Sequence, residues 1–505
     1  LAERGGRMRR VGRESRLSLN TPGGAVAALI VTATIVRLLM AAALGLGIDE
    51  SYMVAAGRQV QWGYFDHPPL AWWLATGAAR LFSSEAPVVV RLPFIALFAV
   101  STWLTFRLGA TLFGPRAGAW AALALNLAPV FGVTSGGWVL PDGPLDCALL
   151  AAAACLVHAL PAERHAWHWW LGAGVAAGLA LLSKYTAALV LAGAFLYLLT
   201  APAHRPWLRR SHPYVAALLA LALFVPVVAW NAMHGWASLG FQGGRATAER
   251  LYPAGPLIVL GGEALYLLPW LWLAMMMALV QALRAGPADW RRWLPACLGL
   301  PPIVLFALVG LWTRHVMFHW AAPGYLMLFP LLGAALERWA ARWPRMVRGT
   351  AWATAGLLCA GLALVAGEVR WGWPPLPTAR VHPGADPALD AVDWTALRAA
   401  LADRPGAVVG AMNWREAGKI DYALGGTVPV ICLNADRRQY AFVPQNLPPD
   451  GDMVIVATKP VTRARLAGQG YAVEALSPLP SVLLAGPGRP GLTLFLYAAR
   501  GLRPA

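Results

Sequence analysis

Apolar runs of transmembrane length constrain the fold of this chain more than any other feature. They recur from Ala25 to Ala366, and a helix needs roughly 20 apolar residues to cross the hydrocarbon core of a bilayer. Because 58% of the residues are hydrophobic and only 13% are charged, a purely soluble fold is excluded. The runs predict a mainly α-helical, polytopic domain with about eleven spans, at Gly24–Leu44, Pro87–Leu108, Ala117–Gly132, Gly143–His158, Trp169–Leu182, Thr186–Thr200, Pro213–Asn231, Pro256–Leu283, Trp293–Trp312, Pro323–Leu336 and Thr350–Ala366.

Arginine residues indicate how these spans are oriented. The net charge of +17 comes almost entirely from arginine, which clusters in the N-terminal tail and in alternate short loops. Positive loops face the cytoplasm, so we expect the N-terminus inside and, with an odd number of spans, the C-terminus outside. This distribution argues against a nucleic-acid partner. The basic segment at 7–16 mimics a signal peptide, but the many later spans favour a retained first helix.

The composition changes after Ala366, and we predict two domains, a transmembrane domain over 1–366 and a small extracytoplasmic α/β domain over 367–505. In the second domain, short apolar segments typical of strands alternate with helical patterns. The predicted strands are Ala407–Ala411, Pro429–Leu433, Met453–Ala457 and Leu492–Ala498, and the predicted helices are Leu389–Leu401, Arg415–Leu424 and Val461–Gln469. Four of the five cysteines fall in apolar spans, so no disulfide framework is implied.

The loop from Asp49 to Leu74 concentrates charge between two long apolar segments. Asp49 and Glu50 open it, and the run Tyr64-Phe65-Asp66-His67-Pro68-Pro69 follows. Its prolines fix the backbone direction and therefore the directions of Asp66 and His67. Asp49 and Glu50 can act as a base or metal ligand, or simply start a solvated loop. Asp66 can also cap the following helix, and His67 can bind a phosphate or a metal.

Further polar residues lie on the same outer side, and they have functional as well as structural interpretations. Asp142 is a helix cap or a substrate-facing acid. Lys184 either extends its ammonium to the membrane surface or binds a phosphate. Gln242 and Arg245 follow an aromatic residue in a glycine-rich segment that allows close approach of a ligand. Arg314 and His319 form a second basic cluster suited to a phosphate, with a metal pair of His315 and His319 as the weaker alternative.

Several of these segments resemble bacterial membrane glycosyltransferases, the protein-mannosyltransferase-like and aminoarabinose-transferase-like members of the C-type superfamily. The resemblance rests on residues 49–52 (DESY), 63–70 (GYFDHPPL), 91–93 (RLP), 141–142 (PD) and 182–186 (LSKYT), with similar segments at 241–242, 319–320 and 439–440. It covers the membrane part and is strongest over the first two hundred residues. It implies a polyprenyl-phosphate sugar donor and transfer on the outer face of the bacterial cytoplasmic (inner) membrane. Asp66-His67 stands where aminoarabinose-transferase-like members have Glu-Lys, and residues 413–422 depart from the aromatic-rich pattern of the family.

The resemblance and the residue chemistry together assign roles. The catalytic residues are predicted to be Asp49 as the base, with Glu50 and Asp66, and those that bind the donor phosphate to be His67, Lys184, Arg245 and Arg314. Tyr64, Asp142, Gln242 and His319 are predicted to face the substrates. A phosphate leaving group needs cations more than an acid, and the acceptor needs a base on the opposite face of the sugar. We therefore expect a hexosyl- or pentosyltransferase that inverts the sugar in a single displacement.

The expected partners are a polyprenyl-phosphate-linked sugar, an acceptor lipid, glycan or protein, and the membrane lipids. No cofactor is identified, and a divalent metal held by Asp49, Asp66 and His67 is left open. The alternative is a lipid or sugar transporter or flippase without transferase chemistry.

Overall fold

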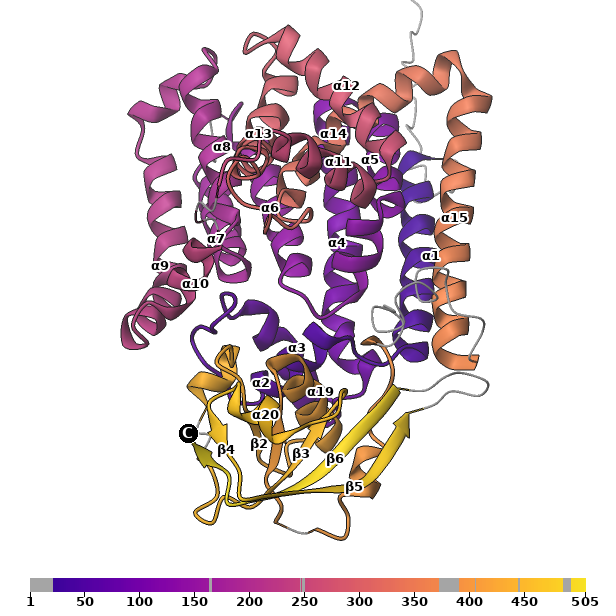
Figure 1. Cartoon of the computed structure of the whole chain (residues 1–505). Coiled ribbons are helices and arrows are strands. Elements are labelled where there is room, and N and C mark those ends of the chain that lie inside the picture. The colour runs from indigo at the N-terminus through magenta and orange to yellow at the C-terminus, as the bar shows by residue number, and fades with distance from the viewer. Residues whose placement is uncertain are drawn as a thin grey trace, which may run out of the picture.

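A bundle of helices and a smaller domain that contains a β-sheet make up the protein (Figure 1). The computed structural model describes residues 21–162, 166–245, 247, 250–371, 390–404, 406–443, 446–484 and 492–505. The smaller domain lies at one end of the bundle, with the first-loop helices α2 and α3 between the two (Figure 1).

All eleven predicted apolar segments contain helix. The helices are α1 (Pro22–Ala43), α4 (Pro87–Phe113), α5 (Pro115–Leu127), α6 (Asp142–Ala159), α7 (Ala166–Ser183), α8 (Ala187–Thr200), α9 (His212–Met233), α11 (Gly255–Leu267), α12 (Pro269–Ala285), α13 (Trp290–Val309), α14 (Ala322–Arg342) and α15 (Pro344–Trp371). In the described part of the chain, α1, α4, α6, α9, α13 and α15 are each long and apolar enough to cross a membrane alone. The chain is therefore a multi-span membrane protein.

One predicted span, Pro256–Leu283, is not a single helix. The chain bends by 113° between α11 and α12. The bend lies at Leu268, which has a φ of 74°, and Pro269 begins α12. Proline has no N–H to donate and excludes the residue before it from the helical region, so it ends one helix and starts the next.

The helices at the centre of the bundle pack through small residues. A Cβ atom on Gly118 of α5 would lie 2.4 Å from the carbonyl oxygen of Phe106 in α4. A Cβ on Gly333 of α14 would lie 2.3 Å from the carbonyl oxygen of Ala117 in α5. Glycine thus lets α5 approach two neighbours closely, which is how helices associate in a lipid environment.

The first loop, predicted only as a charged loop with a helix following Asp66, is mostly helical. It forms α2 (Ile48–Gly57) and α3 (Leu70–Leu81), joined by residues 58–69. The short helix α10 (Ala237–Gly244) follows α9 and reaches the same region, because Gln242 at its end bonds to the backbone of Asp66.

The C-terminal domain is an α/β unit, as predicted. Its sheet has the order β2-β1-β3-β6-β5, with β1 parallel to both neighbours and the other pairs antiparallel. The strands are β1 (Val409–Ala411), β2 (Val430–Cys432), β3 (Met453–Ala457), β5 (Ala475–Leu484) and β6 (Leu492–Arg500), with β4 (Tyr471–Ala472) and β7 (Arg503–Pro504) pairing apart. The helices are α18 (Leu397–Ala400), α19 (Trp414–Leu424), α20 (Arg463–Ala467) and the 3₁₀ turn η4 (Arg438–Phe442).

Helix α19 joins this domain to the membrane part. A Cβ on Gly418 would lie 2.7 Å from the Cα of Tyr52, so α19 packs directly on α2. The predicted helix Leu389–Leu401 is not continuous, because residues 391–396 are not helical and only the single turn of α18 follows them. The boundary at 366/367 stays a prediction.

Candidate active site

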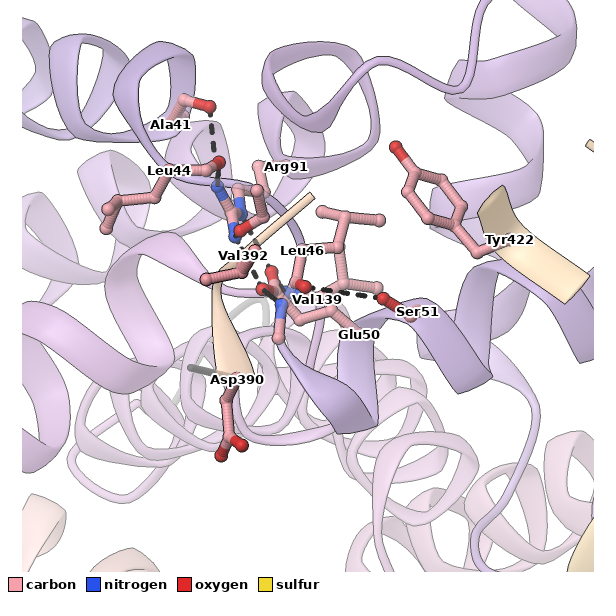
Figure 2. Close-up of polar contacts among 12 residues, drawn as sticks. Ala41, Leu44, Leu46, Glu50, Ser51, Arg91, Val139, Asp390, Val392 and Tyr422 are labelled. Carbon is pink, nitrogen blue, oxygen red and sulfur yellow. Dashed lines mark hydrogen bonds and ion pairs between the residues drawn. The ribbon is translucent and has the colours of Figure 1, made fainter. Parts of the chain in front are cut away.

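Glu50 anchors the turn between α1 and α2 to helix α4. Its buried carboxylate accepts hydrogen bonds from Arg91 at 2.5 and 2.8 Å and from the backbone N–H groups of Gly47 and Val139, each at 2.9 Å. Figure 2 shows the Arg91 guanidinium between this carboxylate and the carbonyl groups at the end of α1. Arg91 and the two N–H groups hold the pKa of Glu50 below its usual value, despite burial that acts in the opposite direction. Glu50 is therefore a positioning group, and its predicted catalytic role is not supported by this geometry.

Asp66 joins three segments that are distant in the sequence. Its Oδ2 accepts a 2.5 Å hydrogen bond from the Tyr52 hydroxyl in α2, and its Oδ1 pairs with Arg438 of the C-terminal domain. Its backbone carbonyl accepts a bond from the side-chain amide of Gln242. Burial raises the pKa of Asp66, and Arg438 opposes that rise. Since both carboxylate oxygens are engaged, Asp66 serves better as an anchor than as a base.

Asp49 lies in the first turn of α2 and stays accessible to solvent. Desolvation by the surrounding protein raises the pKa of the Asp49 carboxyl group, and the negative charge of the neighbouring Asp66 raises it further. Arg415 and Arg438 of the C-terminal domain oppose this rise. An accessible carboxylate with a raised pKa, close to cationic groups, is suited to accept a proton from a substrate.

A second cluster adjoins Asp66 through its sequence neighbour His67. Buried Lys184, which follows α7, bonds to both oxygens of Asp142 at 2.9 and 3.1 Å. His67 and His319 lie within electrostatic range of this pair, and Arg245 lies within range of both histidines. Burial, together with the nearby Lys184 ammonium, lowers the pKa of His67 to about 3 and that of His319 to about 4, so both imidazoles are neutral near pH 7.

Arg245 connects the two clusters. It interacts electrostatically with His67 and His319 on one side and with Asp66 and Arg438 on the other. Its guanidinium faces the rings of Trp320 at 4.5 Å and Phe241 at 5.4 Å. The predicted residues Asp49, Asp66, His67, Asp142, Lys184, Gln242, Arg245 and His319 are thus brought to one end of the bundle, in two adjoining clusters rather than one pocket.

Two predicted site residues are placed elsewhere. Tyr64 is fully buried, stacks on Trp72 with ring centroids 4.4 Å apart and bonds to the backbone of Gln59, so it belongs to the core rather than facing a substrate. Arg314 lies over the ring of Tyr252 at 4.5 Å instead of joining the Lys184 cluster.

The possible metal site at Asp49, Asp66 and His67 is also not formed. Within the described residues, no three or more His, Cys, Asp or Glu side chains have an arrangement that would hold a metal. The Asp66 carboxylate is instead occupied by Tyr52 and Arg438.

Sequence reasoning missed the contribution of the C-terminal domain. Lys419 donates bonds to the carbonyl groups of Leu46, Asp390 and Val392 at 2.7–2.9 Å, and burial lowers its pKa to about 8. Gln439 accepts a bond from the Phe65 N–H, and its own N–H donates to Tyr52, both at 2.8 Å. The one signal was the similarity at 439–440, which pointed to this turn without showing its partners.

Comparison with known proteins supports the resemblance. Residues 66–230 match the family described as dolichyl-phosphate-mannose-protein mannosyltransferase. A lipid A galacturonosyltransferase of Rhizobium johnstonii is 23% identical over 318 residues, which are 60% of this chain and 62% of that protein. The chain therefore spans less than two thirds of that relative's length.

Solved structures share the fold. ArnT from Cupriavidus metallidurans matches with a TM-score of 0.65, both in the apo state at 17% identity and bound to undecaprenyl phosphate at 18% identity, over 94% of this chain and 98% of ArnT. A mycobacterial arabinofuranosyltransferase, AftD, matches with a TM-score of 0.51 at 17% identity, over 93% of this chain and 41% of AftD. The chain is thus a membrane protein that shares the fold of ArnT, and its residues 66–230 are similar to the dolichyl-phosphate-mannose-protein mannosyltransferase family.

Proposed function

We propose that the protein is a membrane glycosyltransferase that moves a sugar from a polyprenyl-phosphate donor to an acceptor on the outer face of the cytoplasmic membrane. The observation that carries this proposal is the accessible acid Asp49 beside Asp66, next to the buried cationic cluster around Lys184. ArnT, whose fold the chain shares, has been solved with undecaprenyl phosphate bound. That ligand is a polyprenyl phosphate, the leaving group of the proposed donor.

The charge of the Lys184 cluster fits such a donor. Lys184 and Arg245 are cationic, His67 and His319 are neutral near pH 7, and Asp142 is paired with Lys184. A second carboxyl group, that of buried Asp146, also lies within electrostatic range of Lys184 and Asp142. A sugar phosphodiester carries a single negative charge, which the two cations can bind. A second negative charge develops as the polyprenyl phosphate leaves, and fixed cations in a water-poor site stabilise it strongly.

The acceptor is activated on the other side of Asp66. Asp49 accepts the proton of the acceptor hydroxyl or amine as the new glycosidic bond forms and the bond between sugar and phosphate breaks. Attack opposite the leaving phosphate inverts the sugar in one step. The orientation follows from the predicted topology, which puts the C-terminal domain and both clusters on the extracytoplasmic side.

The test offers radiolabelled polyprenyl-phosphate sugar and a lipid extract of the cell envelope to the purified protein. Transfer or hydrolysis of the label supports the enzyme, whereas passage across reconstituted vesicles without chemistry supports the transporter. Asp49→Asn should abolish transfer while the folded protein stays intact, and near-normal activity would remove Asp49 from its role. Protease access to the C-terminal domain from the outside of spheroplasts tests the orientation separately.

A further inference from the structure

The turn at Arg438 inserts the C-terminal domain into the first loop. Arg438 has a φ of 52°, a left-handed conformation that is uncommon for a residue other than glycine. Such a conformation persists where surrounding contacts hold it. Here the next residue, Gln439, supplies those contacts through its bonds to Tyr52 and Phe65.

The Arg438 guanidinium holds two groups that belong to the donor side of the site. It pairs with the Asp66 carboxylate, and it lies 4.6 Å from the ring centroids of Phe241 and Trp414. Phe241 is also faced by Arg245 at 5.4 Å, so its ring contacts one guanidinium from the membrane part and one from the C-terminal domain. A planar guanidinium can pair with a carboxylate and stack on an aromatic ring at the same time, and a lysine ammonium in its place would lose the stacking contact.

We propose that Arg438 is a positioning residue for donor binding, contributed by the C-terminal domain. Arg438 holds the Asp66 carboxylate in place, and Asp66 together with Pro68 and Pro69 sets the direction of His67. Arg438 also holds the Phe241 ring, against which the Arg245 guanidinium packs. Arg438 acts through these residues and does not itself contact the donor phosphate. The inference rests on the proposed function and adds that the donor site is incomplete without the C-terminal domain.

The experiment compares Arg438→Gln, Arg438→Lys and the control Arg437→Gln in the full-length protein. Arg437 is the adjacent arginine in the same turn, and its side chain donates hydrogen bonds to Asn434 and Tyr471 within the C-terminal domain. Donor and acceptor KM values are measured separately, together with the Kd for undecaprenyl phosphate. A misplaced binding group costs about ten- to a hundredfold, so we expect Arg438→Gln to raise the donor KM and the Kd by that factor. Because Arg438 also lowers the pKa of Asp49, the acceptor KM is compared at a pH where Asp49 is ionised in both proteins, and there it should stay within about twofold.

Arg438→Lys should recover part of the loss, and Arg437→Gln should match the wild type. Asp66→Asn combined with Arg438→Gln should be no worse than the poorer single variant, because both remove one interaction. Thermal unfolding checks that each variant folds, and if Arg438→Gln does not fold, Arg438→Lys and Asp66→Asn carry the test. An unchanged donor KM, an equal loss in Arg437→Gln or additive effects would overturn the inference alone. Wild-type protein that neither transfers a sugar nor binds undecaprenyl phosphate would instead overturn the proposed function.

Discussion

Arg91→Met tests whether the ion pair with Glu50 holds the first loop in place. The change removes the guanidinium and keeps an apolar side chain of similar length. Glu50 would then be a buried charge without its partner, at 2% exposure. Breaking a buried pair in this way costs about 3–5 kcal/mol. Three carbonyl oxygens at residues 41, 44 and 45 also lose their donor, at about 1 kcal/mol each where water does not replace it.

A second substitution, Glu50→Gln, separates the cost of the unpaired charge from the other losses in the stability of Arg91→Met. Glu50→Gln removes the charge but keeps an oxygen that accepts a bond from Arg91, so it should cost less than Arg91→Met. Combining the two removes the stranded charge, and we expect the double variant to be more stable than Arg91→Met alone. Thermal unfolding of the purified protein in detergent, followed by tryptophan fluorescence, gives the order of stability: wild type, Glu50→Gln, double variant, Arg91→Met.

Activity per folded molecule separates the two roles of Glu50. If Glu50 only positions the loop, Glu50→Gln should retain transfer activity when corrected for the folded fraction, unlike Asp49→Asn. Normal stability combined with lost activity in Glu50→Gln would restore the catalytic role predicted from the sequence. Arg91→Met with wild-type stability would refute the reasoning about the buried pair.

Three further predictions concern charge. Lys184→Met should weaken binding of undecaprenyl phosphate about a hundredfold, with Lys184→Arg between that variant and the wild type, and an unchanged Kd would exclude Lys184 from the donor site. Because the pKa of Asp49 is raised, transfer should fall with decreasing pH at a higher pH than for an ordinary aspartate, which the pH profile of kcat/KM measures; an acid limb near pH 4 would contradict this. Lys419 has a pKa of about 8 when folded against the ordinary 10.5, so the unfolded chain binds more protons between those values and stability should rise with pH there. Lys419→Met should remove that rise, and an identical slope in both proteins would refute the assignment.

Helices and strands with a clear apolar pattern in their own sequence could be predicted, and those whose structure depends on neighbouring elements could not. Long apolar segments such as α9 and short buried strands such as β3 carry their own signal. Strand β5 was missed because Pro478 and Pro480 interrupt its pattern. The structure places β5 at the edge of the sheet, where proline is tolerated since one side of the strand needs no donor. The bend at Pro269 was hidden because the flanking residues form one continuous apolar window.

The site was predictable in its residues but not in its pairings. An unusual charge near apolar segments identifies Asp66 and Lys184 without any knowledge of the fold. Their partners follow from packing: Arg438 lies 372 residues after Asp66, and Asp142 lies 42 residues before Lys184. The composition of the C-terminal domain gives no reason to single out one of its many arginines.

The three carboxylates of the first loop have different roles because of their partners rather than their spacing. Glu50 is neutralised by Arg91 and Asp66 by Arg438, and both pairs connect the loop to other parts of the chain. Asp49, in the same helix turn as Glu50, has no ion pair within 4.0 Å among the residues that the structure describes, and it is the accessible one of the three. A paired, buried carboxylate must lose an ionic contact before it can bind a proton, whereas Asp49 has none to lose. Two acids therefore hold the shape of the loop, and the third has no ionic contact to lose on binding a proton, which is why we propose Asp49 as the base that takes the proton of the acceptor.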